Sequence, residues 1–267
     1  MSSIEATFHR CRAEGRLALL GYLTAGYPTP ADTVPLVEAI VSGGFDIVEL
    51  GVPFSDPLAD GPTIQRASQT ALANGMNVRR SLEITAELGA RLPVPIVLMG
   101  YYNPFFRYGL DRLAAEADEA GVQGFIVPDL PSEEAADLQA VLAPRGMDYI
   151  GMLAPTSDAT RMEAVCRDAT GFIYCVSLAG VTGARATLSA QLPEFLGRVR
   201  EHTSLPLAVG FGLSRPEHIK SVAKVADGAV VGSAIIGAID AASPQRRQEH
   251  LRTYAESLRA AARLPRR

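Results

Sequence analysis

The sequence has few of the side chains that form covalent intermediates or bind metals. It contains 3 cysteines, 4 histidines and, as its only lysines, Lys220 and Lys224. The cysteines lack zinc or redox spacing, and the apolar surroundings of Cys166 and Cys175 predict burial as small hydrophobic residues. The lysines fall four apart on a predicted outer helix, whereas a Schiff-base lysine should lie on an inner strand or an active-site loop.

The histidines all fall in predicted helices or at their ends, so we expect no histidine-ligated metal: His9, His202, His218 and His250. Acid–base chemistry is therefore left to carboxylates, tyrosines and backbone donors. The formal net charge of −4 argues against nucleic acid or an anionic membrane as the main partner. Charges throughout Met1–Arg16 exclude a signal peptide there, and we expect a cytoplasmic protein.

Short apolar runs alternate with amphipathic helical stretches along the whole chain. The runs fit parallel strands buried on both faces: Ala18–Leu23, Asp46–Leu50, Pro95–Gly100, Gly124–Val127, Tyr149–Leu153, Phe172–Val176, Pro206–Val209 and Gly228–Val231. About eight strand–helix units in 267 residues predict a single (β/α)8 TIM-barrel domain over residues 1–267. A doubly wound sheet is the alternative, but it normally has fewer units, and no G-x-G-x-x-G follows the first strand.

Several helix ends carry recognisable signals. Ser2–Glu14 precedes the first strand and predicts an extra helix that closes the bottom of the barrel. Ser214-x-x-Glu217 has the pattern of a capping box, and Ser132 before two glutamates that of an N-cap. The segment Gln245–Ala261 predicts the last outer helix.

The second strand ends with a carboxylate. If Val48 and Leu50 face the helices, alternation places Glu49 inside the barrel. Desolvation there would raise its pKa, which suits an acid that later acts as a base, although pairing with an arginine in a purely structural role is an equally good reading of the isolated residue. The proline-rich loop that follows presents Asp60 at the barrel mouth, where it could also cap the helix beginning near Pro62.

Glycine-rich loops follow the last three strands. They are Gly180-Val-Thr-Gly183, Gly210-Phe-Gly212 and Gly232-Ser233, the last directly before a helical stretch. Backbone N–H groups in such loops, together with a helix N-terminus, predict a phosphate site. After the third and fourth strands, Tyr101, Tyr102 and Asp129 also reach the mouth, and we expect structural roles for Asp129 and for one tyrosine.

The segment Glu49-Leu-Gly-Val-Pro-Phe-Ser-Asp-Pro-Leu-Ala-Asp60-Gly-Pro-x-Ile-Gln resembles the signature of the tryptophan synthase alpha subunit. The three glycine-rich loops resemble those of the same family, in the same order. The resemblance implies a lyase of tryptophan biosynthesis that cleaves indole-3-glycerol phosphate to indole and glyceraldehyde 3-phosphate. It implies no cofactor in this chain, and a beta subunit as partner in an alpha2-beta2 heterotetramer.

The resemblance also implies individual roles. Glu49 would be the catalytic acid and base, and Asp60 would bind the indole N–H. The substrate-binding positions would be Tyr22, Tyr174, Thr182, Gly183, Phe211, Gly212, Gly232 and Ser233. Three alternatives stay open: a free-standing indole-releasing lyase, another phosphate-binding barrel such as a sugar-phosphate isomerase or epimerase, and a non-catalytic allosteric subunit.

Overall fold

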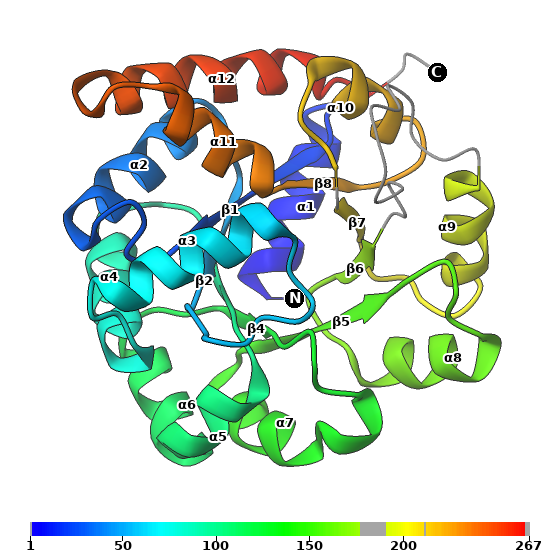
Figure 1. The fold of residues 1–267 in the computed structure, drawn as a ribbon. Helices are drawn as coiled ribbons and strands as arrows, with labels where there is room; N and C mark the ends of the chain where they lie inside the picture. The colour runs from blue at the N-terminus through cyan, green and yellow to red at the C-terminus, as the bar shows by residue number, and fades with distance from the viewer. Residues whose placement is uncertain (1, 177–190, 211, 265–267) are drawn as a thin grey trace.

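Eight parallel strands close into a barrel in chain order, as a computed structural model shows for residues 2–176, 191–210 and 212–264 (Figure 1). The strands are β1 (Ala18–Thr24), β2 (Ile47–Gly51), β3 (Ile96–Met99), β4 (Gly124–Ile126), β5 (Asp148–Leu153), β6 (Ile173–Val176), β7 (Leu207–Gly210) and β8 (Gly228–Val231). Pairing of β1 with both β2 and β8 completes the ring. The predicted (β/α)8 TIM-barrel fold is confirmed.

Helices cover the outside of the barrel and one of its ends (Figure 1). They are α1 (Ser3–Ala13), α2 (Pro30–Ser42), α3 (Pro62–Ala73), α4 (Val78–Arg91), α5 (Tyr102–Tyr108), α6 (Leu110–Glu119), α7 (Ala136–Leu142), α8 (Ala159–Asp168), α9 (Leu192–Arg200), α10 (Pro216–Val222), α11 (Ser233–Ala241) and α12 (Arg247–Ala261). The short 3-10 helices are η1 (Ser132–Glu134), η2 (Ala143–Arg145) and η3 (Pro244–Arg246). Within the described residues, no helix is long and apolar enough to cross a membrane.

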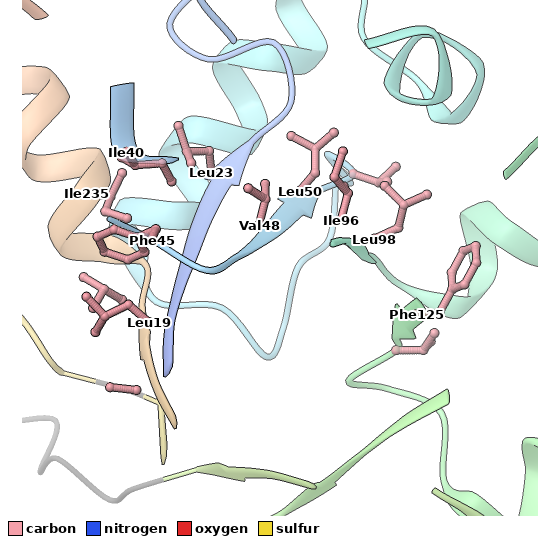
Figure 2. Packing of buried hydrophobic residues seen from close by; sticks show 14 of the residues in the cluster. Leu19, Leu23, Ile40, Phe45, Val48, Leu50, Ile96, Leu98, Phe125 and Ile235 are labelled. Carbon is pink, nitrogen blue, oxygen red and sulfur yellow. The ribbon is translucent and has the colours of Figure 1, made fainter. Parts of the chain in front are cut away.

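Side chains of each strand alternate between two hydrophobic clusters. Leu19 and Leu23 of β1, and Val48 and Leu50 of β2, belong to the cluster between barrel and helices (Figure 2). Ile47 of β2 belongs to the smaller cluster inside the barrel. Because alternate side chains share a face, this arrangement fixes the inward positions of every strand.

The predicted extra N-terminal helix is present as α1. Its cap is Ser2, whose side-chain oxygen accepts a hydrogen bond from the backbone N–H of Glu5 at 3.3 Å. Ile4 and Phe8 pack into the inner cluster, and the Phe8 ring lies 5.5 Å from that of Phe172. The helix therefore closes the end of the barrel at which the strands begin.

Two predicted helix caps are wrong. The helix α10 begins at Pro216, so Ser214 and Glu217 form no capping box; the backbone N–H of Ser214 instead donates to Nδ1 of His218 at 3.2 Å. Ser132 begins the 3-10 helix η1 rather than capping α7. Proline at the first helical turn of α10 fixes the backbone there and overrides the side-chain signal.

Lys220 lies on α10, but that helix ends at Val222, so Lys224 lies beyond it. The burial predicted for Cys166 and Cys175 is confirmed, and Cys11 is buried as well.

Candidate active site

Glu49 lies inside the barrel, as alternation predicts. Its neighbours in the strand register are Tyr22 of β1 and Val97 of β3, and Val97 belongs to the inner cluster. The residue is 0% exposed, and neither carboxyl oxygen has a hydrogen-bond partner among the described residues. Among the described residues, Glu49 therefore does not pair with an arginine, which was the structural role considered for it.

Burial alone raises the pKa of Glu49 from 4.5 to about 8. Burial also raises the pKa of Asp60, to about 6, against a hydrogen bond from Tyr101 that lowers it. At neutral pH, Glu49 thus holds its proton while Asp60 is mostly ionised. Two carboxyl groups with separated pKa values are typical of a site that needs a proton donor beside an anion.

The side chain of Tyr101 fixes Asp60. Its hydroxyl donates to Oδ2 of Asp60 at 3.0 Å and accepts from the backbone N–H of Ala59 at 3.0 Å. Asp60 does not cap α3, because the cap position is Gly61 and no side chain caps it. Sequence reasoning missed this role of Tyr101, since the bond joins loops that follow two different strands.

The other two mouth residues have the structural roles expected. Tyr102 packs against Phe106 with ring centroids 5.6 Å apart. Oδ1 of Asp129 accepts from the backbone N–H of Tyr102 at 2.9 Å, so Asp129 binds the start of α5 rather than of the helix after it. The ring contact lies within α5, whereas the hydrogen bond of Asp129 joins two neighbouring strand–helix units.

Two tyrosines line the interior beside Glu49, and each lies against a glycine. A Cβ added to Gly51 would lie 2.2 Å from Oη of Tyr22, and one added to Gly210 would lie 2.2 Å from Oη of Tyr174. The Tyr22 hydroxyl also shares a hydrogen bond with Oγ1 of Thr24 at 3.2 Å. Burial raises the pKa of both tyrosines, so both hydroxyls stay neutral.

The ends of β7 and β8 supply the glycines proposed for phosphate binding. Gly212 has a φ of +75°, a left-handed conformation that glycine adopts without strain. Gly232 is the cap of α11, and Ser233 is its first residue. The first N–H groups of a helix have no partner within the helix, so this end is suited to an anion. Thr182, Gly183 and Phe211 lie outside the described residues.

One cavity of about 180 Å³ joins these groups. Its lining includes Glu49, Asp60, Tyr22, Tyr174, Gly212, Gly232 and Ser233. Met99, Ile64 and Val230 add apolar surface. The proton donor, the anion, Gly212 and the start of α11 therefore face a single space with a partly apolar wall.

Comparison with known proteins decides the family. The model of the tryptophan synthase alpha chain family matches residues 8–263. The chain belongs to the tryptophan synthase alpha chain family. A tryptophan synthase alpha chain from Chloroflexus aggregans is 49% identical over 97% of both chains. A tryptophan synthase from Saccharomyces cerevisiae is 42% identical over 96% of this chain, but the match covers only 36% of the yeast protein.

Solved structures of the alpha-chain family share the whole architecture. Tryptophan synthase subunit alpha of Legionella pneumophila has a TM-score of 0.90 and 37% identity, covering 98% of each chain. A chain of tryptophan synthase from M. tuberculosis, in an open form, has a TM-score of 0.90 and 36% identity, covering 99% of this chain and 100% of that one.

Proposed function

We propose that Glu49 and Asp60 are the catalytic residues with which this alpha chain, a lyase of tryptophan biosynthesis, cleaves indole-3-glycerol phosphate to indole and glyceraldehyde 3-phosphate. Protonated Glu49 gives its proton to the indole ring carbon that bears the glycerol chain. Asp60 accepts a hydrogen bond from the indole N–H and stabilises the positive charge on the ring. Ionised Glu49 then takes the proton of the adjacent glycerol hydroxyl, the carbon–carbon bond breaks, and its electron pair returns to the ring. Glu49 ends protonated, as it began.

The observation that supports this assignment is the pair of carboxyl groups with different pKa values in one cavity. Glu49 is protonated at neutral pH because it is buried, so it starts as the acid. Once it has lost its proton, the desolvated carboxylate is a stronger base than an ordinary carboxylate, because burial raises its pKa to about 8. Since the indole ring accepts the electrons, the step needs neither a Schiff base nor a metal.

The remaining predicted residues hold the two ends of the substrate. Gly212, Gly232 and Ser233 bind the phosphate through backbone donors and the N-terminus of α11, and Thr182, Gly183 and Phe211 contribute from outside the described residues. Tyr22 and Tyr174 contact the substrate between the phosphate and the indole. Met99 and Ile64 add apolar surface to the same cavity.

Incubation with indole-3-glycerol phosphate and detection of indole tests the function. Glu49→Gln should lower kcat by about 100-fold or more, the usual contribution of a positioned acid or base. Asp60→Asn should lower it as well, while Glu119→Gln, an exposed position on α6, should leave it unchanged. Unchanged cleavage by Glu49→Gln would remove Glu49 from the mechanism. Turnover of a sugar phosphate without indole release would favour an isomerase or epimerase instead.

We infer that a tryptophan synthase beta subunit docks at the mouth of the barrel in an alpha2-beta2 assembly. Among the described residues, the large hydrophobic side chains with the greatest exposure are Leu58, 84% exposed, and Phe106, 60% exposed. They lie in the segments after β2 and β3, which are neighbouring strands, and Phe54 and Tyr101 join these segments with ring centroids 5.3 Å apart. An apolar surface of this kind at the mouth supports a protein partner.

Activity with and without a beta subunit separates this partner from a free-standing lyase. Indole release that rises on addition of the beta subunit is expected, and Leu58→Ser should weaken the response. Full activity of the isolated chain, unaffected by the partner, would favour the free-standing enzyme. We also propose that residues 1–267 act as one domain, that the chain itself uses no cofactor, and that this biosynthetic role places it in the cytoplasm.

A further inference from the structure

A second cavity, of about 900 Å³, lies at the end of the barrel where the strands begin, opposite the candidate active site. Its walls come from α1 and the residues after it, the end of α9 and the segment before β7, the segment between α10 and β8, and α12 with the residues after it. The volume falls within the range of pockets that bind small molecules, roughly 300–1,000 Å³. The proposed lyase reaction makes no use of this end of the molecule.

The walls are held together by backbone hydrogen bonds. The N–H of Leu17 donates to the carbonyl of Ala262 at 2.8 Å, and that of Leu264 donates to Gly15 at 2.9 Å. Arg16 and Arg263 form an isolated antiparallel bridge between the same two segments. The side chains on them therefore project from a fixed frame rather than from free chain ends.

Cationic side chains dominate the lining: Arg12, Arg16, Arg200, Lys224, Arg259 and Arg263. The carboxylates in the lining are Glu14 and Asp227, and each is shared by two arginines. Glu14 lies 2.6 Å from Arg16 and 3.8 Å from Arg259, and Asp227 lies 2.8 Å from Arg200 and 3.9 Å from Arg12. In a chain with a net charge of −4, this is a local concentration of positive charge.

Helix dipoles explain only part of this arrangement. Arg12, Arg200 and Arg259 lie in the last turns of α1, α9 and α12, where a cation is favourable. Lys224 and Arg263 follow the ends of α10 and α12 and have no carboxylate partner within the described residues. Both are exposed, so their donors are available to a ligand.

The geometry points to a binding site for a small polyphosphate anion in this cavity, with Lys224 and Arg263 as its principal cations. The guanidinium of an arginine such as Arg263 can donate two parallel hydrogen bonds to phosphate oxygens, and the ammonium of a lysine such as Lys224 adds a compact positive charge. Phe8, Pro206, Val225 and Leu264 supply an apolar part of the wall, which can accept a group attached to the phosphates. A nucleic acid is the weaker fit, because the positive charge is confined to one cavity of an acidic protein.

Lysine footprinting tests the site with inorganic pyrophosphate as the probe. The chain has Lys220 and Lys224 as its only lysines, and Lys220, exposed on α10, is the internal control because it does not line the cavity. At ten times the dissociation constant, pyrophosphate should slow acetylation of Lys224 by about tenfold, as mass action requires, without slowing that of Lys220. Equal slowing of both lysines, or of neither, would overturn the proposal.

Calorimetry on the whole chain supplies the second measurement. The Lys224→Ala/Arg263→Ala variant should bind pyrophosphate at least about tenfold more weakly, because charge-assisted contacts are lost. The control variant is Arg161→Ala, an exposed arginine on α8, which should bind like the wild type. Indole release should persist in all variants and reports that they fold.

ADP in place of pyrophosphate separates the sources of the phosphate group. If ADP binds more tightly than pyrophosphate, the apolar wall contacts the nucleoside. If the two bind equally, the site recognises the phosphates alone. Both results support the site. If the double variant still binds pyrophosphate as the wild type does, the probe binds elsewhere, for example at the start of α11. This result would overturn the assignment.

Discussion

Glu49→Gln should change how the stability of the protein depends on pH, independently of any effect on catalysis. Below about pH 4.5 the carboxyl is protonated in both the folded and the unfolded chain and contributes nothing. Between pH 4.5 and about 8, the folded protein keeps the proton that the unfolded chain has lost. Since the folded state binds more protons, the free energy of unfolding falls as pH rises through this window.

The size of the effect follows from the pKa shift. Each pH unit within the window lowers the free energy of unfolding by about 1.4 kcal/mol. Between about pH 5 and pH 8 the loss from Glu49 is therefore about 3 to 4 kcal/mol. The residue is fully buried, so screening by solvent does not reduce this figure. Glutamine does not titrate, so the free energy of unfolding of Glu49→Gln lacks this fall with pH.

Urea denaturation of both proteins at about pH 5 and pH 8 measures the effect. The quantity of interest is the stability of Glu49→Gln minus that of the wild type, because other titrating groups cancel in the difference. It should rise by about 3 to 4 kcal/mol from the lower to the higher pH. Any constant cost of burying the amide also cancels. Glu119→Gln is the exposed control. A difference that does not change with pH would refute the argument that Glu49 is buried without a partner.

Three further predictions concern the candidate site. The pH profile of kcat/KM should be bell-shaped, with an acidic limb near pH 6 from Asp60 and a basic limb near pH 8 from Glu49. Tyr101→Phe should move the acidic limb to higher pH, because the hydrogen bond from Tyr101 lowers the pKa of Asp60. A flat profile would contradict this assignment. Gly210→Ala should destabilise the protein by about 1–3 kcal/mol and raise KM, since the added methyl group would displace Tyr174. The control is Gly197→Ala, which has open space around it and should change neither the stability nor KM. The hydroxyl of Tyr27 accepts a hydrogen bond from Arg66 of α3 at 2.8 Å and donates one to Asp240 of α11, beside the ion pair of Arg66 with Asp240. Tyr27→Phe should raise KM by loosening the two sides of the cavity, yet lower the free energy of unfolding by less than about 1 kcal/mol, because Arg66 and Asp240 are partly exposed. An unchanged KM would show that these helices need no such link.

Strands and the direction of Glu49 could be predicted from the sequence because both depend on local pattern. A strand buried on both faces is an apolar run, and the eight predicted runs agree with the structure to within one residue at each end. Alternation along β2 then determines on which side of the sheet Glu49 lies.

Contacts between units could not be predicted in the same way. Tyr101 binds Asp60, and Asp129 binds the start of α5, because barrel closure brings loops from neighbouring strands together. Nothing near Tyr101 in the sequence distinguishes it from Tyr102. The capping box at Ser214 was wrong for a local reason, because α10 begins only at Pro216 and Nδ1 of His218 accepts from the backbone N–H of Ser214.

The order of strands around the barrel has a consequence for how the enzyme can be divided. Glu49 lies in β2 and Asp60 in the loop after it, whereas Gly232 and Ser233 follow β8, and the two strands flank β1. No fragment that lacks either end of this span contains both halves of the cavity. A nascent chain released before α11 would carry the acid and its tyrosine neighbour without the helix terminus proposed to bind the phosphate, so we expect activity only once the last strand has joined the first.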